Sequence, residues 1–308
     1  MTQFEQSMVI RTYSLFRGST ALPFDLTPEA SDAVPRKKEQ VGSWAKSLHA
    51  GLLIINADDW GRDTETTDRM FECVLHGSVS SVSAMVFMED SERAAAIARE
   101  RGIDAGLHLN FTTRLSAPNC PSQHAERQQE IAGYLRQRRF NRMVFHPGLI
   151  RSFEYVVRAQ IDEYRRLYGA PPDRIDGHHH MHLCANVLFG RLLPSGTTVR
   201  RNFSFEPGER SLVNRSYRRF VDILLTRHHR LTDYFFSLVP LEPFARLEKI
   251  FSFARDSVVE VETHPVNLEE YRFLMGEELL RLSANTRIST SFTISGEESG
   301  RRRHARRS

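Results

Sequence analysis

Seven consecutive residues, DGHHHMH at 176–182, hold four histidines and one aspartate. Imidazole and carboxylate groups together suit a divalent cation such as zinc, manganese, cobalt or magnesium, with positions left open for water. Three other short stretches carry side chains of the same kinds: NADDWG at 56–61, GLHLN at 106–110 and ETHP at 262–265. One carboxylate and two histidines form a common ligand set for hydrolytic metal sites, so the four stretches together predict such a site.

These stretches lie in or directly after predicted strands, which alternate with predicted helices. The apolar run GLLIINA at 51–57 is typical of a strand buried on both faces. Further strands are predicted at 81–87, 103–111, 173–179 and 257–264. Helices are predicted at 64–77, 90–102, 122–139, 151–168, 211–228, 242–254 and 268–283. Roughly seven or eight strand–helix units predict an α/β fold, a distorted (β/α) TIM-like barrel in preference to an open doubly wound sheet.

Parallel strands bring their carboxyl ends to one rim, so the polar residues found there are expected to converge. Asp58 and Asp59 are neighbours that cannot easily both face one metal, so one should bind it while the other acts as a base. In an extended segment, His178 and His180 point to one side and His179 points to the other. At most two of these three histidines are therefore expected to face the pocket.

In this order and at these separations, the motifs INADDWG, GLHLN, IDGHHHMH and ETHP resemble those of the YdjC-like carbohydrate deacetylases. This family is also called the chitooligosaccharide deacetylase or hopanoid-associated deacetylase group. The resemblance covers about residues 51–285. It implies a distorted β/α barrel, one divalent cation and removal of N-acetyl groups from amino sugars. Trp60 departs from the family's usual Phe, and the arginine-rich stretch 215–230 and both tails depart as well.

The resemblance also implies roles for individual residues. Asp59, His108 and His178 would be the metal ligands, and Asp58 would be the catalytic base. His264 would be the acid or a substrate-positioning group, which requires its pKa to stay at or above the ordinary histidine value. Four further residues are expected to support the ligands or to touch the substrate: His180, Asp176, Asn110 and Glu262.

The extended geometry of 176–182 predicts a ranking of alanine variants. His178→Ala should lose metal and activity, His180→Ala should lose mostly activity, and His179→Ala should keep most of both. Asp176 lies on the His178 side of the chain and could orient an imidazole through its free ring nitrogen. Its alanine variant should therefore weaken the site by roughly 10–100-fold without emptying it.

Two other functions remain open from the residues. The first is a metal-dependent phosphoesterase or another amidohydrolase, for which His180 and His182 could supply part of a second metal site. The second is a catalytically silent sugar- or metal-binding protein. That hypothesis is less favoured because Asp58 stands beside Asp59, although binding alone does not require it.

Charge and cysteine usage limit the partners and the compartment. The net charge is +4, but five arginines lie within the last eight residues, so residues 1–300 are close to neutral and no nucleic-acid partner is indicated. Three cysteines without a CxxC pair favour a reducing, cytoplasmic setting. No apolar run is long enough for stable membrane insertion and no secretory signal is present. The expected partner is an N-acetylated sugar, and assembly into a homo-oligomer stays open.

The chain is expected to form one domain with extensions at both ends. Residues 1–48 include the polar stretch TPEASDAVPRKKEQ and predict an irregular N-terminal extension. The barrel is expected at 49–287 and a basic tail at 288–308. The segment RSYRRFVDILLTRHHR at 215–230 has an apolar centre between basic residues. It predicts an ordinary barrel helix with Phe220, Ile223 and Leu224 pointing inward, or else a helix that approaches an anionic membrane.

Overall fold

The computed structural model describes residues 51–292, apart from positions 206–208, 285, 287 and 290–291. The predicted N-terminal extension at 1–48 and most of the predicted tail at 288–308 lie outside these residues. Within the described part of the chain, no helix is both long and apolar enough to cross a membrane.

Seven parallel strands form one curved sheet in the order β5-β4-β3-β2-β1-β7-β6. No ladder joins β5 to β6 among the described strands, and β5 instead forms an isolated parallel bridge, Thr198 to Arg230, with the segment before β6. The sheet is therefore a distorted (β/α) barrel, which confirms the predicted fold class. The strands are β1 Leu52–Trp60, β2 Ser81–Ala84, β3 Ala105–Leu109, β4 Arg174–Gly177, β5 Thr198–Val199, β6 Tyr234–Ser237 and β7 Val258–Thr263.

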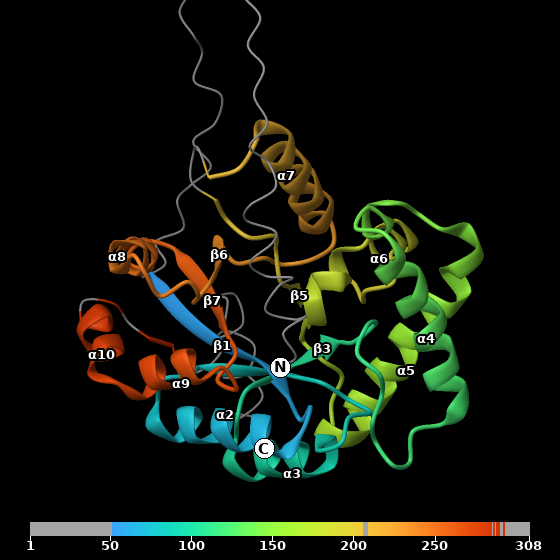
Figure 1. Cartoon of the computed structure of the whole chain (residues 1–308), viewed down its shortest axis with the longest axis horizontal. Coiled ribbons are helices and arrows are strands. Elements are labelled where there is room, and N and C mark those ends of the chain that lie inside the picture. Colours follow the sequence, from blue (N-terminus) through green and yellow to red (C-terminus); the bar gives the residue numbers. More distant parts are fainter. Residues whose placement is uncertain (1–50, 206–208, 285, 287, 290–291, 293–308) are drawn as a thin grey trace, which may run out of the picture. The chain divides into compact units, whose positions relative to one another are not determined.

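Helices surround the sheet (Figure 1). The α-helices are α2 Thr64–His76, α3 Ser91–Arg101, α4 Ser122–Gln137, α5 Ile150–Tyr168, α6 Ala185–Gly190, α7 Leu212–Thr226, α8 Phe244–Phe253, α9 Leu268–Met275 and α10 Glu277–Ser283. Three 3₁₀ turns join them: η1 Asn141–Met143, η2 Pro147–Leu149 and η3 His178–Leu183. The single helix predicted at 268–283 was wrong, because extended backbone at Gly276 divides it into α9 and α10. The sequence analysis also missed β5 and β6, which are too short for a clear periodic signal.

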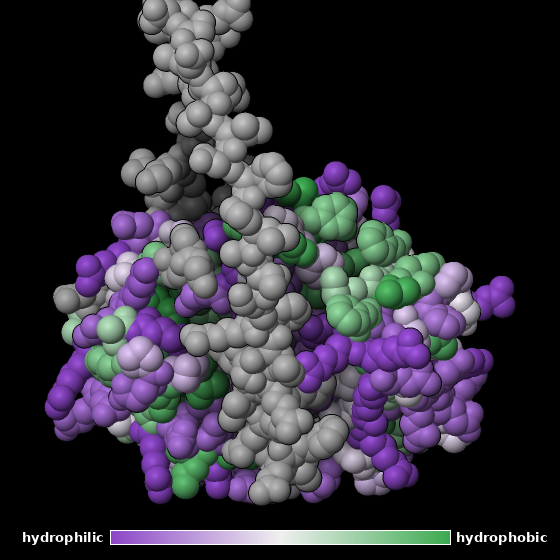
Figure 2. All heavy atoms as spheres, turned by 45° about the horizontal axis from the view of Figure 1, so that its top comes forward, coloured by the Kyte–Doolittle hydropathy of each residue, from purple (hydrophilic) through white to green (hydrophobic). Residues whose placement is uncertain are grey.

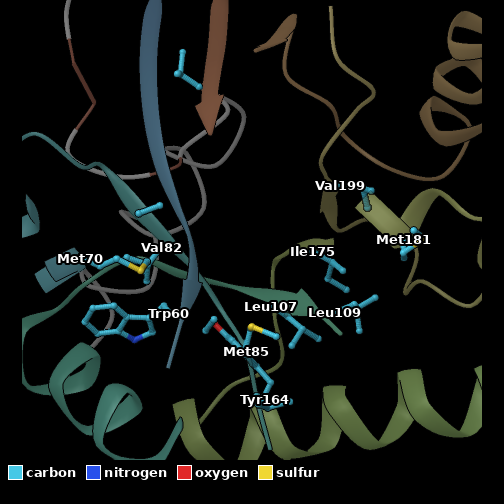
Figure 3. Close-up of a cluster of buried hydrophobic side chains, with 14 of the residues drawn as sticks. Trp60, Met70, Val82, Met85, Leu107, Leu109, Tyr164, Ile175, Met181 and Val199 are labelled. Atoms are coloured by element: carbon cyan, nitrogen blue, oxygen red, sulfur yellow. The ribbon is translucent and has the colours of Figure 1, made fainter. Parts of the chain in front are cut away.

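The outer face of the sheet carries the apolar core. Val82, Leu107, Ile175 and Val199 come from four neighbouring strands and are all buried (Figure 3). Tyr164 of α5 packs beneath them and donates its hydroxyl hydrogen to the Ala105 carbonyl at 2.6 Å. Helix and sheet are thus held together by a continuous apolar layer, as strand–helix alternation requires.

The inner face of the barrel is polar instead. Asn56 on β1 donates to Ser83 at 2.7 Å and to Asp58 at 2.8 Å, and it accepts from Ser81 at 2.7 Å. On β7 the residues that alternate with core valines are Glu260 and Glu262, both buried. Side chains alternate across a strand, so one face can be apolar while the other carries chemistry. The prediction that the first strand is buried on both faces is confirmed, although its buried inner face is polar at the carboxyl end.

Residues beyond the predicted barrel boundary also contact the sheet. Ile288 forms an isolated parallel bridge to Leu53. The Phe292 backbone N–H donates to Asp104 at 2.6 Å, and its ring lies 4.4 Å from the Arg174 guanidinium. The described residues of this segment therefore belong to the barrel body.

Helix α7 is held to the barrel by a narrow face. Val221 and Leu225 are buried, and buried Asp222 pairs with Arg201 at 2.8 Å. Phe220 and Ile223 are half exposed, so the prediction that they point inward was wrong. At about 100° per residue they fall on the side of the helix opposite the buried positions.

Candidate metal and catalytic centre

A β-bulge at the end of β1 orients the two adjacent aspartates. The register with β2 shifts between Asp58 and Trp60, and Asp59 adopts the left-handed conformation with φ of 77°. A bulge re-aims the side chains of a strand, and aspartate tolerates this backbone region better than most residues. Both carboxylates consequently lie inside the rim of the barrel, each with its own partners.

Asp59 meets two histidines from other strands. Its Oδ1 lies 2.8 Å from His178 Nδ1 and 3.3 Å from His108 Nε2, and all three residues are buried. Their potential ligand atoms lie within 4.8 Å of one another, so the cluster could hold a metal ion. The structure thus brings together the three residues predicted as ligands, from β1, the end of β3 and the residue after β4.

Asp176 fixes the orientation of one of these imidazoles. Its Oδ1 lies 2.8 Å from His108 Nδ1, while Oδ2 accepts a hydrogen bond from Ser83 at 2.6 Å. A carboxylate on one ring nitrogen leaves the other nitrogen with its lone pair toward a metal. The sequence predicted that Asp176 could orient an imidazole, and the structure identifies the partner as His108 on the neighbouring strand.

The extended geometry predicted for 176–182 was wrong. β4 ends at Gly177, and the histidines lie in η3, where His179 and His180 have φ of 55° and 58°. The turn folds the His179 ring against that of His178, with centroids 3.9 Å apart, and its Nδ1 lies 2.9 Å from Thr112 Oγ1. His179 therefore does not face away from the site, and the predicted ranking loses its geometric basis.

His179→Ala is now expected to weaken metal binding by roughly tenfold, since the variant loses a ring that supports His178. Titration of the metal-stripped protein with Zn²⁺ or Mn²⁺, followed by calorimetry, measures the effect. His76→Ala, at an exposed position on α2, is the control and should bind as the wild type does. Wild-type affinity in His179→Ala would show that the ring contact contributes nothing to the site.

The other two histidines of the run take different partners. His182 is buried, and its Nε2 donates to the Arg200 carbonyl at 3.0 Å. His180 Nε2 lies 3.6 Å from Glu262, and its ring packs edge-on against Phe203 at 4.7 Å. Burial and Arg200 hold the pKa of His180 well below its ordinary value. His180 is thus a neutral ring between the carboxylates and an aromatic side chain.

Arg200, directly after β5, was missed by the sequence analysis although it links the whole inner face. It is buried, and its guanidinium lies 2.6 Å from Asp58, 2.8 Å from Asp176 and 2.7 Å from Glu260. Both terminal nitrogens donate to Asp58, at 2.6 and 2.8 Å, so that pair is bidentate. A planar guanidinium suits this arrangement because it presents several donors in a fixed fork. The signal available in the sequence was an arginine following the short β-branched stretch TTV.

The predicted acid, His264, follows β7, the strand that pairs with β1 on the side away from β2. The backbone N–H of His264 donates to Glu270 at 2.9 Å. Burial lowers the pKa of His264, but the charges of Glu270, Asp58 and Glu262 outweigh it and raise the pKa overall. This matches the expected direction and adds Glu270, which the sequence analysis had not considered.

Asn110 has a structural task near the site. It is buried, and its side chain accepts from the backbone N–H groups of Thr112 and Thr113 at 3.1 and 2.8 Å. Its amide nitrogen donates to the Thr113 carbonyl at 2.6 Å. These bonds close the turn after β3 and so place Thr112 under His179. Asn110 thus acts on the loop and makes no recorded contact with Asp59, His108 or His178.

The electrostatics of the cluster fit an added cation. Burial lowers the pKa of His108, but Asp58 and Asp176 outweigh it and raise the pKa to about 10. Burial and Asp58 raise the pKa of Glu262 to about 8. The carboxylates of the inner face therefore keep His108 and Glu262 protonated to a higher pH than usual. Asp59 Oδ1 is also buried without an aligned hydrogen-bond partner among the described residues, as expected of an atom that would hold a cation.

These shifts predict how stability depends on pH. In metal-stripped protein, His108 and Glu262 keep protons that the unfolded chain releases. The free energy of unfolding should therefore fall as pH rises from about 7 to about 10. Denaturant titrations with a chelator, and with saturating Zn²⁺, measure this slope. The slope should shrink with metal, because the cation replaces the His108 proton; parallel curves would contradict the assignment.

Comparisons with known proteins agree with this geometry. A family model described as YdjC-like protein matches residues 52–283. A chitooligosaccharide deacetylase of Proteus mirabilis is 33% identical over 140 residues, 45% of this chain and 53% of the relative. A carbohydrate deacetylase of Enterococcus faecalis is 26% identical over 224 residues, 70% of this chain and 81% of the relative.

One solved structure supports the fold. It is a protein of Enterococcus faecalis, proposed to be a cellobiose-phosphate cleavage protein, with a TM-score of 0.56 and 19% identity. The match covers 78% of this chain and 97% of that one. Several sequence matches are partial, and four of them span 44–64% of the relatives' own length. The family model nevertheless covers most of the chain, and the protein belongs to the YdjC-like family.

Proposed function

We propose that this protein is a metal-dependent hydrolase that removes the N-acetyl group from an amino sugar, in a monosaccharide, an oligosaccharide or a glycolipid. The observation that carries the proposal is the position of Asp58 beside the Asp59–His108–His178 cluster, held there by Arg200. Relatives named as chitooligosaccharide or carbohydrate deacetylases support the substrate class.

Asp59, His108 and His178 would hold one divalent cation, and Asp176 would orient His108 from behind. Two imidazoles and one carboxylate suit zinc, manganese or cobalt. They suit magnesium less well, because magnesium prefers oxygen ligands. When bound, such a cation polarises the acetyl carbonyl and makes a nearby water more acidic.

The chain's own residues would move the protons. Asp58 would accept a proton from the attacking water, and Arg200 fixes the position of that carboxylate through two hydrogen bonds. His264, whose pKa the surrounding carboxylates raise, would give a proton to the leaving nitrogen. Glu262 and His180 lie beside this path and would contact the sugar or support these groups. The products would be acetate and a free amino sugar.

The test is acetate release from a panel of N-acetylated sugars, including N,N′-diacetylchitobiose, by protein loaded with Zn²⁺, Mn²⁺, Co²⁺ or Mg²⁺. Release with at least one sugar and one metal is expected. If protein shown to hold metal releases no acetate from any sugar of the panel, the result would instead favour a sugar- or metal-binding protein.

Metal stoichiometry separates the deacetylase from a two-metal phosphoesterase. A second group of possible metal ligands consists of Asp58, His108 and Asp176. The Arg200 guanidinium already forms ion pairs with its two aspartates, and the Arg200 carbonyl accepts a hydrogen bond from His182. One tightly bound ion per chain is therefore expected, and two would favour the phosphoesterase.

For the compartment we propose the cytoplasm, because Cys73 and Cys184 are buried as free thiols.

A further inference from the structure

Large apolar side chains are exposed in three segments around α7, α6 and the turn η1. They account for nine of the twelve exposed large hydrophobic residues of the described chain. Figure 2 shows hydrophobic side chains gathered on one side of the surface, next to strongly hydrophilic ones. The nine residues are Phe140, Met143, Val144, Phe145, Phe189, Leu212, Val213, Phe220 and Ile223. We call them, with the arginines between them, the apolar–arginine face.

The outer side of α7 is apolar and basic. Leu212 is 77% exposed and Val213 is 81% exposed, and Phe220 and Ile223 follow on the same side of the helix. Arg219 and Arg227 are exposed on that side as well. The single acid of this helix, Asp222, is buried on the other side and paired with Arg201. The exposed side of α7 therefore combines apolar and positive groups without a negative one.

The turn before α5 has the same composition. Residues 136–148, RQRRFNRMVFHPG, contain four arginines and no acid, and almost all of them are exposed. Phe140 alone is 71% exposed. Phe189 on α6 extends the apolar part, because α6 packs against η1.

Arg142 links the two parts of the face. Burial, together with the charges of Arg142 and Arg210, lowers the pKa of Arg218 on α7 to about 10. Arg142 also acts on the pKa of Tyr217, the neighbouring α7 residue, which burial raises. Such a coulombic effect fades over about 10 Å, so Arg142 lies near α7, and η1, which contains Arg142, also packs against α6.

We propose that the apolar–arginine face binds the surface of an anionic lipid bilayer. Interfacial protein surfaces combine aromatic and aliphatic side chains with arginines that reach the headgroups, and this face has that composition. A nucleic acid would not use apolar side chains exposed to this extent. An acidic protein would need matching apolar pockets, whereas a bilayer accepts the nine side chains as they stand.

The side of α7 opposite this face adjoins the candidate centre. Arg218, which is partly buried on that side, lies 5.0 Å from the Phe205 ring, which lies 6.4 Å from the Phe203 ring. Phe203 in turn contacts His180 at 4.7 Å. In a protein bound through this face, α7 would therefore lie between the bilayer and the Asp–His cluster.

Cosedimentation of the full chain with vesicles tests the proposal. Binding is expected to vesicles of phosphatidylcholine mixed with phosphatidylglycerol, and not to phosphatidylcholine alone. The double variant Phe220→Ser/Ile223→Ser should bind roughly tenfold more weakly, although its charge is unchanged. Arg219→Glu/Arg227→Glu should lose roughly tenfold or more. Matched controls are Leu75→Ser/Leu280→Ser, exposed apolar positions elsewhere, and Arg99→Glu, an exposed arginine on α3.

The uncharged double variant separates this face from the arginines at 301–307, which would also attract anionic vesicles. Unchanged binding of Phe220→Ser/Ile223→Ser would overturn the proposal, and so would failure of the wild type to bind either vesicle. Sedimentation velocity adds a further check: a dimer that becomes a monomer in this variant would assign the face to a second copy of the chain. Acetate release from a soluble sugar is measured separately, so either proposal can fail alone.

Discussion

Asp58→Asn is expected to lower acetate release by roughly 10²–10⁴-fold while the protein keeps its metal. The substituted amide can still accept a hydrogen bond from Arg200, so the barrel interior should stay filled. It cannot take a proton from water, which is the role proposed for this carboxylate. Single-turnover rates and metal content, measured on the same preparation, give the two readouts.

Two aspartate variants serve as comparisons. Asp59→Asn should lose metal and turnover together, because its Oδ1 faces both histidines. Asp222→Asn changes another arginine-paired aspartate, one that pairs with Arg201 and not with the Asp59–His108–His178 cluster, and should keep normal turnover. If Asp58→Asn loses metal as Asp59→Asn does, Asp58 is a ligand and the proposed base lies elsewhere.

Arg200→Met is expected to destabilise the fold by roughly 3–5 kcal/mol, the range for breaking a buried ion pair by removing one partner. Methionine fills much of the same volume, so the effect would come mainly from charge. The guanidinium pairs with Asp58, Asp176 and Glu260, and without it three buried carboxylates face one another. Urea titration of the wild type and the variant gives the difference in the free energy of unfolding.

The loss should depend on pH in a defined direction. In the wild type, burial raises the pKa of Asp176, but the charges of Arg200 and His108 outweigh it and lower the pKa overall. The stability that this carboxylate contributes is therefore fully present above the ordinary aspartate pKa and is lost in acid. Without Arg200, the pKa of Asp176 and Glu260 would rise, and the folded variant would bind protons more readily than the unfolded chain. Its deficit should therefore shrink as pH falls from 7 to about 5.

Arg201→Met is the matched control, because it changes the next residue in the chain. Arg201 is partly exposed and pairs with Asp222, so its loss should cost about 1 kcal/mol with little dependence on pH. Equal losses in the two variants would show that the Arg200 network contributes no more than the partly exposed pair of Arg201 and Asp222.

The candidate centre could be predicted largely from local sequence. A carboxylate or imidazole at the carboxyl end of a buried parallel strand has only one rim on which to lie. Asp59, His108 and His178 therefore converge in the structure as the strand order requires. Alternation along β7, VVEVET, likewise carried the information that Glu260 and Glu262 share an inner face.

Local conformation limited what the sequence could show. The extended interpretation of DGHHHMH failed because β4 ends at Gly177 and two histidines take left-handed backbone angles. The same conformation at Asp59 turns two neighbouring carboxylates into the barrel. Left-handed residues other than glycine are held by their surroundings, so strand periodicity gives no sign of them.

By itself, the sequence determined the parallel strand–helix order, the rim on which acids and imidazoles meet, and the family. Only the tertiary structure decided which side chains are partners. Arg200 lies 142 positions from Asp58 in the chain and yet makes its shortest contact there, within a bidentate pair. β5, the strand that precedes Arg200, has two residues, too few for any periodic signal. A buried arginine costs too much free energy without partners, and those partners come from β1, β4 and β7 at once, which only the curved sheet brings together.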